Sequence, residues 1–199
     1  MKDLGLMHYF LRLKVWQSLA GIFLNQGKYA VEILKRFDML DRKAMATPMD
    51  TNLKLLSDES SELVDMTHYS LIIGTLMYMM NTMPAICFVV HTLSQYLVKP
   101  RRVHLIAAKH VMKYLKGTID FGLYYGRYHD YSLYGYTDSD WAGSVADKNS
   151  TSGGCYCLGS TMISWFSKKQ SSVDLITAEA EYIEVFYADC EPIWIHKLM

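Results

Sequence analysis

Two aspartates that are two positions apart, Asp138 and Asp140, stand in the stretch "YTDSDWAG". Aspartate is depleted in β-strands, yet the preceding residues, "SLYGY", alternate as strand residues do. Either the pair closes a turn, or one carboxylate is held there for chemistry. Carboxylate oxygens are ligands that Mg²⁺ prefers, and Glu181 further along the chain is the candidate second ligand. Helix capping and surface salt links are the ordinary alternative roles for such acids.

The elements that must position these acids follow from hydrophobic periodicity. From Thr118 onward, "GLYYGR", "SLYGYTD", "GGCYCLGS" and "MISWFSKK" predict strands separated by turns. The last 24 residues predict a helix that carries Glu181 and is kinked at Pro192. Asp138 on a strand and Glu181 on the following helix are then expected to meet at one edge of an α/β layer.

The first half of the chain predicts a hairpin within "WQSLAGIFLNQGKYA" and a helix within "KYAVEILKRFDML". The stretch from Met66 to Val98 has no Lys, Arg, Asp or Glu and is long enough to cross a bilayer. Asn81, Thr82 and Pro84 interrupt it, so two buried helices joined by a short turn are favoured over a membrane span. The residues expected inside this region are Leu76, Met77, Met80, Ile86 and Val90.

A basic stripe is predicted on the helix in "KPRRVHLIAAKHVMKYLKG". At 100° per residue, Arg102, Lys109, Lys113 and Lys116 fall in one narrow sector. No acidic residue occurs from position 66 to position 119. The stripe is therefore either a solvated face or a track for a phosphate backbone. Net charge does not decide between these interpretations, because 20 basic residues balance 20 acidic residues.

The composition is that of a globular protein, with 51% hydrophobic and 20% charged residues. Its four cysteines show neither the CxxC pairs of a zinc site nor a dense disulfide pattern. The N-terminal "MKDLGLMHYF" lacks the long apolar core of a signal peptide. We therefore expect reduced thiols, an intracellular location in the cytoplasm or nucleus, and no membrane partner.

The C-terminal third resembles the ribonuclease H domain of copia-type retrotransposon polyproteins. The blocks "DSDWAG", "STSG", "ISW", "SKKQ" and "EAEY" occur in the family's order and near its spacing. The rest of the chain is similar to the segment of the same polyprotein that follows the reverse-transcriptase active site. That similarity is carried by "MKDLG", "HYFL", "GIFLNQGKYA", "TPM", "GTLMYM", "LSQYLVKP" and "YLKGT". The resemblance covers nearly all 199 residues.

The resemblance implies roles for several residues. Asp138 matches the family's first metal-binding aspartate, and Glu181 matches the glutamate on the first helix, so both are expected to be catalytic and to hold Mg²⁺. Lys168 and Lys169 join the basic stripe as candidate nucleic-acid contacts. The implied partners are an RNA–DNA hybrid or another nucleic acid, and the remaining segments of the Pol polyprotein.

The implied fold class is α+β, with a helical lobe followed by a truncated α/β layer of three antiparallel strands and a first helix. Residues 1–26 are expected to form the hairpin that ends the reverse-transcriptase palm. Residues 27–118 are expected to form a helical region like a thumb or connection domain. Residues 119–199 are expected to form the truncated ribonuclease H-like domain.

The family carries out RNA-directed DNA synthesis and RNA–DNA hybrid cleavage. This sequence contains no Tyr-x-Asp-Asp polymerase motif, and the third and fourth acids of the ribonuclease H site are absent. Arg12, Met83, Ala85 and Ala178 also depart from the family's usual Gly, Arg, Asp and Thr. We therefore expect a polyprotein fragment that is inactive as isolated. The alternative is a non-enzymatic relic that binds nucleic acid.

Overall fold

The computed structural model describes residues 5–49, 61–127, 132–140 and 150–170, and three single helical positions, Ile193, Ile195 and Lys197. The chain divides into two compact units, Met1–Arg127 and Tyr128–Met199. The first contains helices and an antiparallel sheet, and the second contains another antiparallel sheet, so the α+β class is confirmed. Apart from the three single positions, the helix predicted over the last 24 residues lies outside the described residues.

The sheet of the first unit has four antiparallel strands in the order β1-β2-β3-β4. Its strands are β1 (Tyr9–Phe10), β2 (Leu13–Ser18), β3 (Gly21–Asn25) and β4 (Gly122–Gly126). The predicted hairpin is confirmed as β2 and β3, which pair from Lys14–Asn25 to Ser18–Gly21.

Strand β4 has its partner in the first unit. Its residues were expected to open the second domain at position 119, but β4 pairs with β3 along its whole length. The boundary between the compact units consequently falls after Arg127. Hydrophobic alternation predicted the strand correctly, but it carries no information about which distant strand will be the neighbour.

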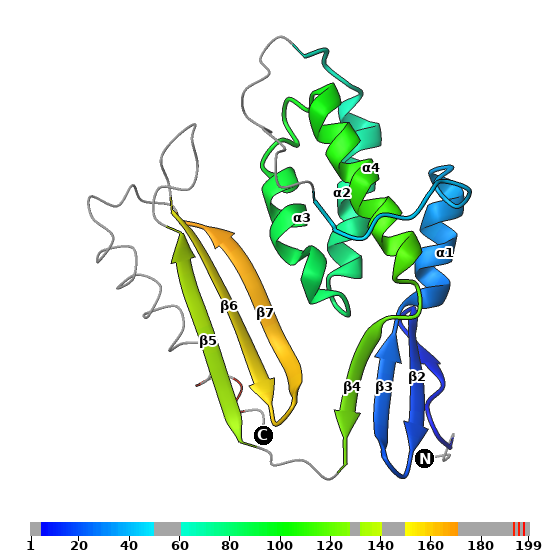
Figure 1. Ribbon diagram of the computed structural model, residues 1–199, viewed down its shortest axis with the longest axis vertical. Helices are drawn as coiled ribbons and strands as arrows, with labels where there is room; N and C mark the ends of the chain where they lie inside the picture. The colour runs from blue at the N-terminus through cyan, green and yellow to red at the C-terminus, as the bar shows by residue number, and fades with distance from the viewer. Residues whose placement is uncertain are drawn as a thin grey trace. The chain divides into compact units, whose positions relative to one another are not determined.

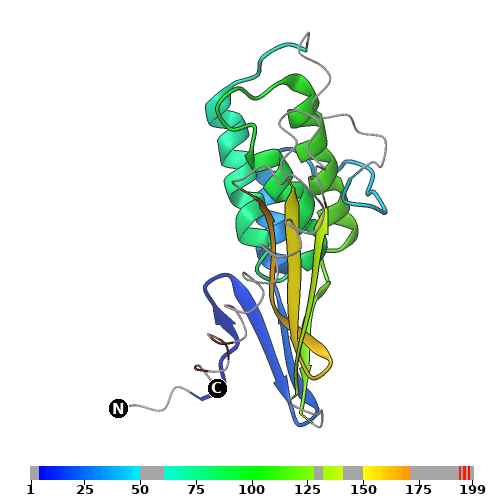
Figure 2. The same ribbon diagram turned by 90° about the vertical axis from the view of Figure 1, so that its left-hand side faces the viewer.

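The helices of the first unit pack into one cluster, which Figures 1 and 2 show from two sides. They are α1 (Gly27–Arg36), α2 (Met66–Met79), the 3₁₀ helix η1 (Pro84–Ile86), α3 (Cys87–Ser94) and α4 (Arg102–Gly117). Helix α2 begins after Asp65, whose carboxylate accepts hydrogen bonds from the N–H groups of Thr67 (2.9 Å) and His68 (3.3 Å). This capping satisfies two N–H groups that have no partner inside the helix.

The uncharged stretch forms two helices, as predicted, with Pro84 at the start of η1 between them. Leu76, Ile86 and Val90 are fully buried and Met80 is partly buried, but Met77 is 40% exposed. The prediction for Met77 was therefore wrong. Met77 follows the exposed Gly74 by three positions, so both lie on the helix face turned away from the core. Within the described residues, no helix is both long enough and apolar enough to cross a membrane.

The second unit contains a three-stranded antiparallel sheet in the order β5-β6-β7. Its strands are β5 (Leu133–Asp140), β6 (Thr151–Leu158) and β7 (Thr161–Lys169), which confirms the three strands predicted there. On one face the ring of Tyr156 covers Gly135, where an added Cβ would come within 2.8 Å of the ring. Glycine at this position lets the aromatic ring lie close to the neighbouring strand.

Candidate functional site

Asp138 lies within the body of β5 rather than at a turn. Its Cα pairs with that of Gly153 in β6, and Gly153 pairs in turn with Ser167 in β7. Cross-strand partners share one face of a sheet, so the neighbours of Asp138 on that face are a glycine and a serine. With no bulky neighbour across the strands, the aspartate stays exposed.

The two lysines of "SKKQ" lie on opposite faces of this sheet. Lys169 pairs with Thr151, and Lys168 pairs with Ser152. Because Thr151 is two positions from Gly153, Lys169 is on the same face as Asp138. Lys168 is on the other face, which also carries Ser152 and Tyr156. The structure thus brings one of these two candidates to the face of Asp138.

The predicted metal site is described only in part. Asp138 supplies one carboxylate, whereas Glu181 lies outside the described residues. Among the residues that the structure does describe, there is no group of three or more His, Cys, Asp or Glu side chains that could hold a metal ion. One carboxylate falls short of the several oxygen ligands that Mg²⁺ requires.

The shifted pKa values in the described part of the chain have burial as their main cause. Desolvation raises the pKa of Tyr69, whose hydroxyl donates a 2.8 Å hydrogen bond to the carbonyl oxygen of Leu93. Burial also raises the pKa of the Cys155 thiol, with a further contribution from Cys157. A raised thiol pKa disfavours the thiolate, so Cys155 is a poor nucleophile.

The four cations of the predicted basic stripe all lie on α4, but their surroundings differ. Arg102 approaches Glu62 with 3.8 Å between guanidinium Nη1 and carboxylate Oε2, and both side chains are largely exposed. The Lys116 ammonium donates a hydrogen bond to the main-chain carbonyl of Arg42. Lys109 and Lys113 line a cavity. The stripe is thus divided between an exposed ion pair, a contact with the chain after α1, and a cavity wall.

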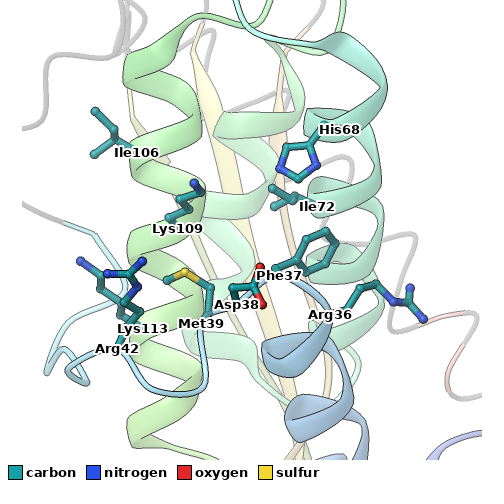
Figure 3. A pocket seen from close by; sticks show the side chains of 10 residues that line it. All are labelled: Arg36, Phe37, Asp38, Met39, Arg42, His68, Ile72, Ile106, Lys109 and Lys113. Atoms are coloured by element: carbon teal, nitrogen blue, oxygen red, sulfur yellow. The ribbon is translucent and has the colours of Figure 1, made fainter.

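The cavity has a volume of about 480 Å³ and lies where the end of α1 meets α2 and α4 (Figure 3). Its charged lining consists of four cations and one carboxylate. The lining residues are Arg36, Phe37, Asp38, Met39, Arg42, His68, Ile72, Ile106, Lys109 and Lys113. Positive charge therefore predominates, beside an apolar wall.

The end of α1 has a specific backbone geometry that places two of these residues in the cavity lining. The Asp38 N–H donates to the carbonyl oxygen of Lys35 (3.3 Å), and the Met39 N–H donates to that of Leu34 (2.8 Å). Asp38 has a φ of +54°, in the left-handed region. These bonds form the reversal that commonly ends a helix, with an aspartate where glycine is usual.

The sequence did not identify Arg36, Asp38, Arg42 and His68 as residues that line this cavity. The local signal was "KRFDMLDR", which indicates only a positively charged helix end. The meeting of this segment with Lys109 and Lys113 depends on the packing of α1, α2 and α4 around a shared core. Nothing in the spacing of the residues encodes that packing.

The chain is similar over nearly its whole length to proteins of transposable elements. It is 40% identical over 193 residues to the retrovirus-related Pol polyprotein from transposon RE2 of Arabidopsis thaliana, a match that covers 97% of this chain and 13% of that protein. It is 35% identical over 208 residues to the corresponding polyprotein from transposon TNT 1-94 of Nicotiana tabacum, covering 100% and 16%. An uncharacterized mitochondrial protein of Arabidopsis thaliana is 38% identical over 195 residues, covering 98% and 80%.

By these similarities the chain falls in the class of polyprotein sequences found in transposons. The chain belongs to the family of retrovirus-related Pol polyproteins of copia-type retrotransposons. It spans 13–16% of the length of the Pol polyproteins that it matches. No family model matches the chain. No solved structure matches it either.

Proposed function

We propose that this chain is the part of a retrotransposon Pol polyprotein in which the end of a reverse transcriptase leads into a ribonuclease H domain. The roles of such a polyprotein are RNA-directed DNA synthesis and RNA–DNA hybrid cleavage. The order of the described elements supports this proposal: a hairpin, a helical cluster, and then a separate antiparallel sheet. The observation that carries it is the exposed Asp138 in the body of the first strand of that sheet.

In this proposal Asp138 and Glu181 provide the carboxylates for Mg²⁺. When bound, the ion would supply a Lewis acid that activates water for attack on a phosphodiester. Asp138 is suited to such a role because it is exposed and Gly153 leaves space beside it. Two carboxylates support at most one weakly held ion, because Mg²⁺ gives up its water reluctantly. The isolated chain is therefore expected to be inactive.

The test is cleavage of an end-labelled RNA–DNA hybrid at millimolar Mg²⁺. The purified 199-residue chain is expected to show no cleavage above background. A longer protein that continues into the following polyprotein sequence is expected to cleave, and Asp138→Asn in that protein is expected to abolish cleavage. Cleavage by the 199-residue chain that disappears on Asp138→Asn would contradict the predicted inactivity. Another acid would then complete the site, with Asp140 the first candidate.

A second candidate function is nucleic-acid binding without cleavage. It is favoured by Lys109 and Lys113, since no described carboxylate lies within ion-pair distance of either side chain. Binding to an RNA–DNA hybrid should then weaken as salt rises, because phosphate contacts release counterions. Changing Lys109, Lys113 and Lys116 to Ala should reduce the salt slope by about one unit for each phosphate that is no longer bound. An unchanged slope would identify the stripe as a solvated face.

A further inference from the structure

The cavity beside the end of α1 gathers positive charge from three different segments. Arg36 ends α1, Arg42 lies in the chain that follows it, and Lys109 and Lys113 come from α4. The ion pair found among the described residues joins Arg102 and Glu62, so none of the four cavity cations is paired with a described acid. Asp38 lines the same cavity but lies beyond ion-pair distance of these cations.

The cavity is also lined by apolar side chains, which matter as much as the charged ones. Ile72 and Met39 are buried and close the cavity from the side of the core. Ile106 is 56% exposed on α4, and Phe37 packs edge-on against the His68 ring with the ring centroids 6.0 Å apart. Figure 3 shows Ile72 and Phe37 on the side of α2 near His68, and Ile106 on α4, the helix that also carries Lys109 and Lys113. A ligand that fills the cavity therefore meets cations and apolar carbon together.

We propose that this cavity binds a phosphate monoester carried on an apolar or aromatic group. A monoester carries a charge of about −1.5 to −2 near neutral pH and has three strong acceptor oxygens, so it can engage several cations at once. A phosphodiester carries one negative charge, and a basic track along a strand meets such charges one after another. Cations that line a single cavity fit the monoester better. A volume of about 480 Å³ is within the usual range for small-ligand sites.

The proposal does not depend on hybrid cleavage, and its test can fail independently. The probe is phenyl phosphate, titrated by calorimetry into the full chain at low ionic strength, with inorganic phosphate and phenol as comparison ligands. Phenyl phosphate is expected to bind more tightly than inorganic phosphate, and phenol is expected not to bind. This order would show that both the charge and the apolar group contribute.

Three variants locate the site. Combining Lys109→Gln with Lys113→Gln is expected to weaken phenyl phosphate binding by about tenfold or more, since charged hydrogen bonds are removed. Lys35→Gln is the matched control, because Lys35 is an exposed cation in the last turn of α1 that does not line the cavity. Ile106→Gln should weaken phenyl phosphate binding and leave inorganic phosphate binding unchanged.

The source of the phosphate is distinguished with a short single-stranded oligonucleotide that carries either a 5′-phosphate or a 5′-hydroxyl. A preference for the phosphorylated form that is abolished when Arg36 and Arg42 are both changed to Gln assigns the site to a strand end. Equal binding of the two forms assigns it to small phosphorylated molecules. Absence of saturable phenyl phosphate binding by folded protein, checked by circular dichroism, would overturn the proposal. An equal loss of binding in Lys35→Gln would overturn it as well.

Discussion

The hydroxyl of Thr82 donates a 2.8 Å hydrogen bond to the side-chain Oε1 of Gln26, and each residue is 2% exposed. The Nε2 of Gln26 also donates to the carbonyl oxygen of Tyr78 at 3.3 Å. Gln26 directly precedes α1, and Thr82 lies in the turn between α2 and η1. A buried polar pair therefore joins the start of the helical cluster to a turn far along the chain.

Removing both partners of this pair should cost less than the sum of the costs of removing each one alone. Thr82→Val or Gln26→Leu alone leaves a buried polar group unsatisfied and should lower the free energy of unfolding by about 1–3 kcal/mol. The double variant should be less destabilised than the sum of the two single variants, because neither partner is left behind. Urea unfolding followed by circular dichroism measures all four proteins. Strict additivity would show that the hydrogen bond contributes no coupling energy.

Substitutions at Asp38 should show whether its backbone conformation or its charge has the larger effect on the free energy of unfolding. Its φ of +54° is readily adopted by glycine and tolerated by asparagine. Asp38→Gly should therefore raise the free energy of unfolding by about 0.5–1 kcal/mol, and Asp38→Asn should change it little. Asp38→Ala should destabilise by about 1 kcal/mol, because alanine is strained in this region. Equal stability of the Gly and Ala variants in urea titrations would contradict this account.

Substitution by alanine at Gly122 and at Gly74 should change the free energy of unfolding in opposite directions. A Cβ on Gly122 would lie 2.1 Å from the carbonyl oxygen of Leu24, so Gly122→Ala should separate β3 from β4 and cost about 1–3 kcal/mol. A Cβ on Gly74, inside α2, would meet nothing within 4 Å, so Gly74→Ala should stabilise by about 0.5–1 kcal/mol. Thermal unfolding of the two variants checks both signs. A stable Gly122→Ala protein would show that β3 and β4 are not paired this closely.

Burial on α3 lowers the pKa of His91 below its ordinary value of 6.5, and its Nδ1 lies 3.4 Å from the Cys87 sulfur. A lowered pKa means that the folded state favours the neutral imidazole. The contribution of His91 to stability is therefore complete above pH 6.5 and is lost as the pH falls below it toward the folded-state pKa. Unfolding measured between pH 7.5 and 5.5 should show a smaller decline in His91→Gln than in the unchanged protein. His8→Gln, at an exposed position, is the control for the loss of an imidazole.

Lys168 and Lys169 lie on opposite faces of the sheet. Substituting each in turn should show which face contacts nucleic acid, without a cleavage assay. If nucleic acid contacts the face that carries Asp138, Lys169→Gln should weaken hybrid binding several-fold and reduce its salt slope by about one unit. Lys168→Gln should have a smaller effect. Fluorescence anisotropy with a labelled hybrid at several salt concentrations provides the measurement. A larger effect of Lys168→Gln would assign nucleic-acid binding to the other face.

The parts of the fold that follow from neighbouring residues were predictable. The hairpin was indicated by two apolar runs around a turn, and the division of the uncharged stretch was indicated by Pro84, which opens η1. The error at Met77 arose because an apolar residue was assumed to face inward. Composition alone does not say where on an apolar helix the core ends, since folded proteins expose many apolar side chains.

The parts that depend on contacts between distant segments were not predictable. The pairing of β4 with β3 and the meeting of Arg36 with Lys109 at one cavity both join segments that are far apart in the sequence. Asp138 was identified by its setting in the sequence, and the register of β5 with β6 then gave it Gly153 as a neighbour. Register also separated Lys168 from Lys169, because a strand sends successive side chains to opposite faces.

The pairing of β3 with β4 makes the helical cluster an insertion within the sheet. Asn25 at the end of β3 is the Cα partner of Gly122 at the start of β4, so the chain leaves the sheet and returns to it at adjacent points. Antiparallel strands with adjacent ends can be joined by a tight turn. The chain between these two positions forms the helices whose side chains make up most of the core. The ends of the helical insertion are therefore held side by side by the pairing of β3 with β4.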